Sequence, residues 1–419
     1  MVMGTVAGSR FRRKAIQPEA AWEKIAACVQ QLETIEVALA EAEGMHLAEN
    51  VIAPAPLPHF ARSGMDGFAI RSADIQTASS EHPVLLEVID NIPCGAAPNK
   101  AVLPGTAART MTGAMVPDGA DAVIMLEMTE ERNKDGKAYI AVRRSIAKGD
   151  NVSLAGSEIA QGELLMEAGR RIGAGEISLL AAFGYSRVKV HRRPVVAVLS
   201  TGTELLEVAE PLVPGKIRNS NAPMLAALIR EEGGVARLAG KIPDDLAQAK
   251  RKLAELFGQA DLVITTGGVS VGDYDIMTDL FNEWSGTMLF NKVAMRPGSP
   301  TTVGVLHKKL LFALSGNPGA CHAGFKLFVL PALRGMQGQK QPQLPIVDAY
   351  LAADYPKVNG FRRYLRGRFQ YQNGQIFVVP IGSDKSSVMV SIKDAECLIM
   401  IPPGGTGMRA GDPVQAIML

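Results

Sequence analysis

Residues 195–202 read Val-Val-Ala-Val-Leu-Ser-Thr-Gly, an unbroken apolar run that ends in two hydroxyl residues and a glycine. An apolar run without alternation is typical of a strand covered on both faces, as in a parallel sheet flanked by helices. Ligands of such sheets bind outside the carboxyl ends of the strands, where Ser200 to Gly202 would lie. This segment therefore predicts an α/β domain with a candidate ligand loop after its first strand.

The sequence after Gly202 continues to alternate between helix and strand patterns. Apolar periodicity predicts helices over 222–232, 246–257, 275–284 and 320–333, and strands over 235–239, 262–265 and around Val293, Val303 and Leu311. Strands that alternate with helices form a parallel sheet with helices on both faces. We expect residues 194–338 to form a doubly wound α/β domain with a parallel sheet.

The rest of the chain predicts three further parts. Helical spacing from Pro18 to about Glu43 contributes to an N-terminal helical/β connector domain made of residues 1–58 and 159–193. Short apolar runs at 84–89, 122–126 and 138–142 predict a mostly β middle domain over 59–158. Similar runs at 376–380, 388–392 and 398–401 predict a small β barrel over 339–419. The fold class is therefore multi-domain α/β.

Length and composition exclude several classes of protein. The 419 residues suffice for two to four domains at roughly 150 residues each. The net charge of +2 gives no general attraction to nucleic acid or a membrane surface, and no apolar run approaches the about 18 residues of a membrane helix. The 4 cysteines lie far apart without a C-x-x-C pair, which argues against a zinc module. With no signal segment after the N-terminal basic cluster, we expect a cytoplasmic protein.

Three glycine-containing loops follow predicted strands. They are Ser200–Leu205, Thr265–Gly272 and Ser315–Gly319, and each leads toward a helix. Glycine lets the backbone approach a ligand, and the free N–H groups at a helix start can bind an anion. Any one of these loops could equally be an ordinary tight turn. Three of them at strand ends predict one shared crevice. None has the pattern of a P-loop or a dinucleotide fingerprint, which disfavours nucleoside triphosphate hydrolysis and hydride transfer.

Charged residues lie close to these loops. The acidic ones predict a joint phosphate and Mg²⁺ site, because carboxylates near a bound anion need a hard cation; they are Asp66, Glu204, Asp244, Asp245, Asp273 and Asp275. Asp244 and Asp245 could instead cap the helix that starts near Leu246. Lys292 and Arg296 could bind an oxyanion or be ordinary surface cations. Loop 382–387 could provide hydroxyl groups to a ligand or be an ordinary exposed loop. Cys321-His322 is predicted to be a packed pair at a helix start, because one thiol and one imidazole do not make a complete metal site.

Several motifs in order along the chain resemble the molybdopterin molybdenumtransferase family, which includes the C-terminal domain of gephyrin. The resemblance runs from about Pro18 to the C-terminus and rests on Ser63-Gly-Met-Asp-Gly-Phe-Ala69, Met111-Thr-Gly-Ala114, Gly119-Ala-Asp-Ala-Val123, Ser200-Thr-Gly-Thr-Glu-Leu205, Ile264-Thr-Thr-Gly-Gly-Val-Ser-Val-Gly-Asp273, Lys292-Val-Ala-Met-Arg-Pro-Gly298 and Ser315-Gly-Asn-Pro-Gly319.

This resemblance implies a homodimer that inserts molybdenum, supplied as molybdate, into the dithiolene of adenylylated molybdopterin, with Mg²⁺-dependent release of AMP. It implies that Asp66 of one copy completes the α/β site of the other. The implied partners are the adenylylating enzyme and the apoproteins of molybdoenzymes, with no nucleic acid and no membrane.

The resemblance and the loops together give a set of candidate site residues. Asp66, Thr112 and Glu204 are the catalytic candidates, and Glu204, Asp273 and Asp275 are the metal candidates. The substrate-binding candidates are Gly202, Asp244, Asp245, Thr266, Gly267, Gly268, Ser270, Lys292, Arg296, Ser315, Asn317, Pro318 and Ser386.

The chain departs from common family patterns at a few positions. Arg296 and Ser299 stand where many members have lysine, and Glu158 stands where aspartate is common. Segment 149–156 lacks paired arginines that are often found there. These differences leave open a non-catalytic molybdopterin carrier. An enzyme that uses tungstate also stays open, because molybdate and tungstate are tetrahedral dianions of similar size. Retention of the acidic residues favours catalysis, because a pure anion carrier would bind more tightly without them.

Overall fold

The computed structural model describes residues 14–242, 245–268, 280–281, 285–358 and 360–419. The chain divides into two compact units, each described by itself below. Unit 1 comprises Met1–Glu49, Ala168–Ser178 and Ser186–Leu419, and unit 2 comprises Asn50–Glu167 and Leu179–Tyr185. The predicted division into four parts is finer than these two units and stays a prediction. None of the helices formed by the described residues has the length and apolar character of a membrane-spanning segment.

The centre of unit 1 is a six-stranded sheet. Its strands, in spatial order, are β17 (Val235–Lys241), β14 (Val195–Ser200), β18 (Leu262–Thr266), β22 (Lys309–Leu314), β21 (Thr302–Leu306) and β19 (Thr287–Phe290). The first four strands run parallel, as predicted, whereas β21 pairs antiparallel with β22 and β19 pairs antiparallel with β21. The predicted parallel pairing therefore holds for these four strands and does not extend to the edge formed by β21 and β19. The reason is a two-residue hairpin at His307 and Lys308, whose φ angles of 49° and 66° suit such a turn.

The order of the parallel strands locates a binding edge. Along the chain β14 comes first, β17 second, β18 third and β22 fourth, so the spatial order is second, first, third, fourth. The connection from β14 therefore leads to β17 at one edge of the sheet, and the connection from β18 leads to β22 in the opposite direction. The crevice outside the carboxyl ends of two such strands is the usual ligand site of doubly wound sheets. Here it lies just after Ser200 and Thr266.

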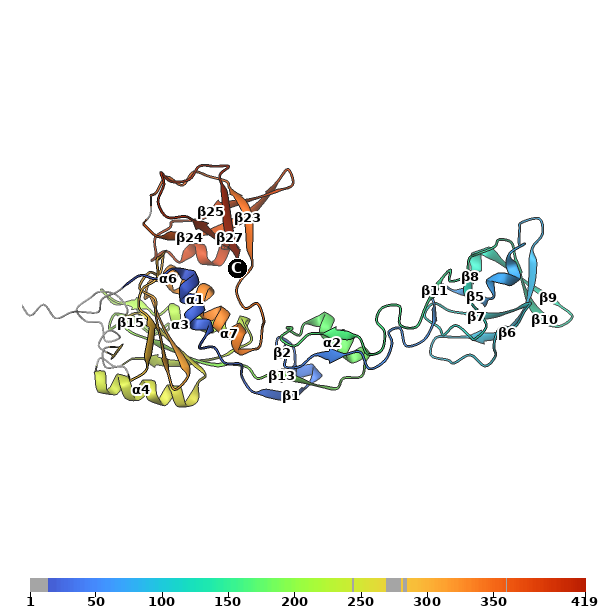
Figure 1. Cartoon of the computed structure of the whole chain (residues 1–419), viewed down its shortest axis with the longest axis horizontal. Helices are drawn as coiled ribbons and strands as arrows, with labels where there is room; N and C mark the ends of the chain where they lie inside the picture. The colour runs from blue at the N-terminus through green and yellow to red at the C-terminus, as the bar shows by residue number, and fades with distance from the viewer. Residues whose placement is uncertain (1–13, 243–244, 269–279, 282–284, 359) are drawn as a thin grey trace, which may run out of the picture. The chain divides into compact units, whose positions relative to one another are not determined.

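Helices cover both faces of this sheet (Figure 1). They are α1 (Pro18–Ala26), α3 (Asn221–Glu231), α4 (Leu246–Gln259), α6 (Pro318–Gly324) and α7 (Leu330–Met336), and a π-helical turn, η4 (Phe325–Val329), joins the last two. Val196 and Val198 of β14 pack into the core on the side of α1, α3, α6 and α7. Ala197 and Leu199 pack into the core beneath α4. The unbroken apolar run of β14 is thus explained by burial on both faces. The predicted helix 275–284 lies outside the described residues except for 280–281.

The N-terminal part of unit 1 corrects one prediction. A three-stranded sheet joins β1 (Thr34–Ala38), β13 (Arg187–His191) and β2 (His46–Leu47). Helical spacing was expected to continue to about Glu43, but α1 ends at Ala26 and only a short 3-10 turn, η1 (Leu39–Glu41), follows β1. The β-branched residues Thr34, Ile35 and Val37 pair with β13 instead, since such side chains favour strands.

The C-terminal part of unit 1 is a closed barrel of five strands, as predicted. The ring runs through β24 (Arg362–Gln372), β25 (Gln375–Pro380), β23 (Ile346–Leu351), β27 (Pro413–Met418) and β26 (Cys397–Ile401), and β26 closes it on β24. The short strand β20 (Met295–Arg296) lies beside β24. The strand predicted over 388–392 is wrong, because a 3-10 helix, η5 (Val390–Asp394), occupies this region. Its Ser391 hydroxyl accepts a hydrogen bond from the buried Arg366 at 2.7 Å.

Unit 2 is mostly β, as predicted for the middle of the chain. Its six-stranded sheet has the order β8 (Ala122–Met125), β5 (Gly67–Ile70), β7 (Thr106–Thr110), β6 (Val84–Ile92), β10 (Lys137–Val142) and β9 (Thr129–Lys134). Smaller ladders pair β4 (Arg62–Ser63) with β11 (Val152–Ser153) and β3 (Val51–Ile52) with β12 (Leu164–Met166). Helix α2 (Ala174–Ala182) begins in unit 1 and ends in unit 2. Because Gly67 begins β5, the preceding Asp66 lies in the turn that enters the sheet.

Candidate functional site

The first loop follows β14, and within it the carboxylate of Glu204 lies next to the backbone of Gly202. Gly202 has a φ of 129°, and a Cβ at this position would collide with the carboxylate of Glu204. The backbone conformation therefore favours glycine here, and a larger residue would also displace the carboxylate end of Glu204. The backbone of Glu204 is fixed by the N–H of Ile217, which donates to its carbonyl at 2.9 Å next to the parallel pair of β15 (Leu205–Leu206) and β16 (Ile217–Arg218).

The second loop packs directly against the first. Gly267 has a φ of 90°, and a Cβ there would lie 2.6 Å from Thr201 Oγ1 and 2.7 Å from the Thr201 carbonyl oxygen. The N–H of Thr201 donates to the carbonyl of Thr266 at 2.9 Å. Gly267 donates its own N–H to Leu314 at 3.0 Å and so extends the pairing of β18 with β22. The Gly267 amide is thus engaged by the protein, and its main contribution is close packing.

The third loop completes the contact. A Cβ on Gly316 would lie 3.3 Å from the Cα of Gly267, and Ser315 is 8% exposed. The three loops, residues 200–204, 265–268 and 315–319, therefore meet at the binding edge of the sheet, and we call them the loop cluster. Each loop contributes one glycine N–H without a hydrogen-bond partner among the described residues, namely Gly202, Gly268 and Gly316. Unpaired backbone N–H groups of this kind can bind an anion.

Asn221 is a residue of the loop cluster that the sequence prediction missed. It opens α3 and donates from Nδ2 to Thr266 Oγ1 at 2.7 Å and to the Gly316 carbonyl at 2.8 Å. The available signal was the Asn219-Ser-Asn221 run before a helix, since asparagine and serine at a helix start make side-chain hydrogen bonds to backbone.

The barrel brings Ser386 to the third loop. Asn317 Nδ2 donates to Ser386 Oγ at 3.2 Å, and the N–H of Gly319 donates to the Ser386 carbonyl at 2.9 Å. Loop 382–387 is therefore held against the start of α6, where Pro318 occupies the first helical turn. Buried Arg366 supports it from below, donating to the carbonyls of Ser383 and Val388 at 3.3 and 3.0 Å. Burial lowers the pKa of this guanidinium.

The predicted basic residues flank a turn with a fixed shape. Ser299 Oγ donates to the Val293 carbonyl at 2.8 Å, and Gly298 adopts a φ of 91°. A Cβ on Gly298 would lie 3.4 Å from the Ala320 carbonyl oxygen, which places this turn against α6. Lys292 Nζ lies 5.9 Å from the ring centroid of Phe361, and Arg296 is exposed. Within the described residues neither cation has an ion-pair partner.

The predicted metal and substrate-binding residues of two further segments are only partly described. Asp245 caps α4, because its carboxylate accepts the N–H of Gln248 at 2.8 Å. Asp245 therefore has the helix-capping role, which the sequence offered as one alternative for this residue. Four further candidate residues lie outside the described residues, namely Asp244, Ser270, Asp273 and Asp275. Among the residues that are described, no group of three His, Cys, Asp or Glu side chains comes close enough to hold a metal ion.

Asp66 and Thr112 form a pair in unit 2. Thr112 donates to Asp66 Oδ1 from its backbone N–H at 2.6 Å and from its hydroxyl at 2.8 Å. These two hydrogen bonds lower the pKa of the Asp66 carboxyl, since they stabilise its charged form. Both residues are exposed. The structure thus brings together the two catalytic candidates of the middle region and fixes the direction of one carboxylate oxygen.

Cys321 and His322 are a packed pair rather than a reactive one. Burial raises the pKa of the Cys321 thiol to about 12, so the thiol stays protonated. Burial lowers the pKa of His322 to about 4, and the nearby cations Lys326 and Arg366 add to this effect. Both side chains lie in α6 directly behind the third loop.

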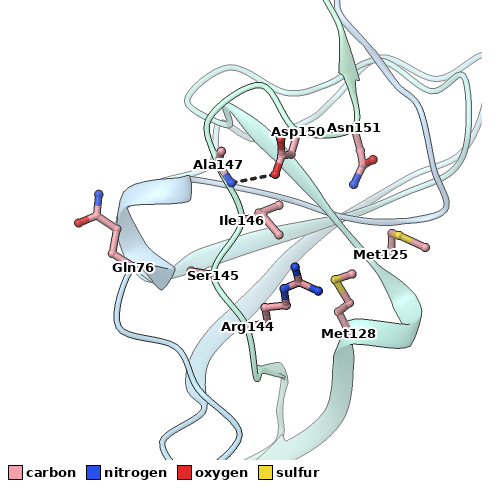
Figure 2. A pocket seen from close by; sticks show the side chains of 9 residues that line it. All are labelled: Gln76, Met125, Met128, Arg144, Ser145, Ile146, Ala147, Asp150 and Asn151. Atoms are coloured by element: carbon pink, nitrogen blue, oxygen red, sulfur yellow. Dashed lines mark hydrogen bonds between the residues drawn. The ribbon is translucent and has the colours of Figure 1, made fainter.

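A separate cavity of about 530 Å³ lies in unit 2. Its wall includes Met125, which pairs with Gly67 across the sheet. Figure 2 shows Arg144 beside Met128 and Ile146, and Asp150 accepting the N–H of Ala147 at 2.8 Å. The cavity lining contains none of the predicted site residues.

Comparison with known proteins matches three family models to successive parts of the chain. Residues 16–184 match the MoeA N-terminal region (domain I and II), residues 197–335 match a probable molybdopterin binding domain, and residues 348–419 match the MoeA C-terminal region (domain IV). The chain is 43% identical to a molybdopterin molybdenumtransferase of Bacillus subtilis, over 97% of this chain and 95% of that protein. The chain belongs to the molybdopterin molybdenumtransferase family. The resemblance seen in the motifs is thereby confirmed.

Other members of the molybdopterin molybdenumtransferase family show similar likeness. A molybdopterin molybdenumtransferase of Staphylococcus aureus (strain MSSA476) is 41% identical over 97% of this chain and 96% of its own length. The crystal structure of the molybdopterin biosynthesis moeA protein from Pyrococcus horikoshii OT3 superposes with a TM-score of 0.81 at 31% identity, covering 97% of this chain and 100% of that one. The loop cluster lies in the part that matches the molybdopterin binding domain.

Proposed function

We propose that this chain is a molybdopterin molybdenumtransferase that inserts molybdenum into the dithiolene of adenylylated molybdopterin and releases AMP. The observation that carries the proposal is the loop cluster, which gathers three glycine-rich loops at the switch point between β14 and β18. The enzyme acts as a transferase in molybdenum cofactor synthesis, with molybdate as the substrate that supplies the metal. The predicted four-part division of the chain belongs to the same proposal.

The loop cluster would bind the phosphate groups of the substrate. The unpaired N–H groups of Gly202, Gly268 and Gly316 offer donors whose position is set by the sheet rather than by flexible side chains. Lys292 and Arg296 add positive charge from the neighbouring turn, and Ser315, Asn317 and Ser386 add hydroxyl and amide groups at the start of α6. The protein's main contribution is then orientation of the phosphoanhydride and of the oxyanion that reacts with the pterin sulfurs.

Glu204 fits the role of a Mg²⁺ ligand. Its carboxylate has no ion-pair partner within the described residues, and Gly202 leaves the space in which it folds back onto the loop. Oxygen ligands are those that Mg²⁺ prefers, and Asp273 and Asp275 would complete the set. When bound, the metal would offset the carboxylate charge and polarise the phosphoanhydride. Asp245, the N-cap of α4, and Asp244 would contribute to substrate binding.

Asp66 and Thr112 would complete the site of a second copy in a homodimer. Thr112 keeps Asp66 ionised and oriented, which suits a carboxylate that accepts a proton or positions an attacking group. Exposed apolar side chains flank the pair in sequence, with Met65 at 41% exposure and Met111 at 43%. Apolar side chains beside an exposed catalytic pair favour a surface that another chain covers. A cytoplasmic enzyme would exchange substrate and product with the adenylylating enzyme and with molybdoenzyme apoproteins.

The test is single-turnover conversion of adenylylated molybdopterin by the purified protein with molybdate and Mg²⁺. We expect AMP release and cofactor formation that both depend on molybdate. Tight pterin binding without AMP release under any oxyanion would refute the transferase and leave a carrier. Replacement of molybdate by tungstate in the same assay would measure the metal preference.

A further inference from the structure

Asn221 connects two of the three loops through one side-chain amide. It is 7% exposed at the first residue of α3. Its Nδ2 donates to Thr266 Oγ1 at 2.7 Å and to the Gly316 carbonyl at 2.8 Å. Both protons of one amide group are therefore used, one on the second loop and one on the third.

The hydrogen bonds continue from Thr266 to the rest of the loop cluster. Thr266 Oγ1 donates to the Ser315 carbonyl at 3.3 Å, and the Thr266 carbonyl accepts the N–H of Thr201 at 2.9 Å. This chain of bonds assigns the orientation of the amide, because Thr266 Oγ1 can accept from Asn221 while its own proton goes to Ser315. Asn221 thus lies at the centre of a network that reaches all three loops.

The other end of the same amide has no partner. Asn221 Oδ1 is buried and makes no hydrogen bond within the described part of the chain. A buried acceptor without a partner is unfavourable for stability. The side chain keeps both N–H hydrogen bonds although its oxygen is left without a partner. This arrangement favours a role for the two N–H donors in holding the loops together. Unpaired buried groups of this kind concentrate at functional sites.

We infer that Asn221 is a positioning residue for molybdenum transfer, which sets the spacing of the Gly268 and Gly316 N–H groups and thereby the affinity for the adenylylated pterin. Gly268 lies two residues after Thr266, and Gly316 carries the carbonyl that Asn221 binds. Loss of either bond would let the second and third loops separate. The inference rests on the proposed function of the loop cluster.

The test replaces the donor while keeping the shape. In Asn221→Asp the ionised carboxylate has no proton to donate and faces the Gly316 carbonyl. We expect the dissociation constant for adenylylated molybdopterin, measured by fluorescence titration at pH 8, to rise at least about 30-fold. Protonation restores one O–H donor, and burial favours the neutral acid, so affinity should partly recover toward pH 5.5. A purely structural defect would not produce this pH-dependent rescue.

Gln337→Glu is the matched control. Gln337 is 2% exposed, and its Nε2 donates to the carbonyls of Glu232 and Leu333 at 3.0 and 3.2 Å. As in Asn221→Asp, a buried amide that donates to a backbone carbonyl becomes a carboxylate. The hydrogen bonds of Gln337, however, involve no residue of the loop cluster. We expect it to lower thermal stability and to leave the dissociation constant within about twofold of the wild type.

Two further variants keep the inference falsifiable. Thr266→Val removes the shared hydroxyl without adding charge, and we expect about a 5-fold rise in the dissociation constant even if Asn221→Asp does not fold. Wild-type affinity in a folded Asn221→Asp or Thr266→Val variant would overturn the inference. Gly267→Ala distinguishes a failure of the role of Asn221 from a failure of the proposed function. If this variant also bound the pterin normally, the loop cluster would not be the pterin site.

Discussion

The loop cluster of unit 1 and the Asp66–Thr112 pair of unit 2 are built in opposite ways. The loop cluster is fixed by a buried sheet, by glycines in contact with neighbouring backbone, and by the amide of Asn221. The Asp66–Thr112 pair rests on two hydrogen bonds between exposed residues. A substrate cradle can thus be preorganised within one unit, whereas an exposed carboxylate needs a second surface to exclude water and direct its reactivity.

The largest effect should come from filling the contact between the first and second loops. Gly267→Ala places a Cβ 2.6 Å from Thr201 Oγ1 in a backbone with φ of 90°. We expect a loss of about 3 kcal/mol in the free energy of unfolding and no measurable molybdenum transfer. Gly258→Ala is the control, because Gly258 lies within α4 with nothing within 4 Å of its Cβ position. That variant should be fully active, and equal damage in both would contradict the account of the loop cluster.

Substitutions in the Asp66–Thr112 pair should change the transfer activity and leave the stability unchanged. Asp66→Asn keeps an oxygen that can accept both bonds from Thr112 but removes the charge. We expect at least about a 100-fold slower single-turnover transfer, with the melting temperature unchanged within about 2 °C. Thr112→Val should slow transfer less, and the double variant should be no slower than Asp66→Asn. Independent effects of the two changes would mean that Thr112 acts separately from Asp66.

The same contrast explains what the sequence could and could not predict. The apolar run of β14, the glycine loops and the barrel were predictable because local pattern and burial agree there. The hairpin at His307 and Lys308 lacks the usual Asn-Gly or Asp-Gly signal, so the antiparallel edge was missed. The strand predicted over 388–392 failed because tertiary hydrogen bonds from Arg366 override local propensity. Asn221 was missed because its partners come from distant loops.

Acid should destabilise unit 1, because His322 in α6 is buried there. Its pKa is about 4 in the folded state against 6.5 when unfolded, so below pH 6.5 the unfolded chain binds a proton that the folded chain does not. Stability is then complete above pH 6.5 and falls as pH drops toward 4, by roughly 2 kcal/mol at pH 4.5.

Denaturant unfolding at pH 7 and pH 4.5 measures this loss. We expect His322→Gln to lose about 2 kcal/mol less than the wild type between these two pH values. The exposed His82 of unit 2 provides the control, and His82→Gln should behave as the wild type. An unchanged pH dependence in His322→Gln would show that His322 is protonated within the folded protein.

The smallest effect should come from the cap of α4. Asp245→Ala removes the acceptor for the Gln248 N–H and should cost about 1 kcal/mol. Asp245→Asn retains a capping oxygen and should keep the wild-type stability. A large loss of activity in the asparagine variant would show that the carboxylate also binds substrate or metal.

Mixing two inactive variants tests most directly whether the loop cluster and Asp66 form one site from two copies. Glu204→Ala damages the loop cluster, and Asp66→Asn damages the exposed pair. If two copies share each site, equal mixing with subunit exchange gives half mixed dimers with one intact site each, and so about a quarter of the wild-type transfer activity. If each chain carries a complete site of its own, mixing restores no activity, and that result would contradict the proposed arrangement.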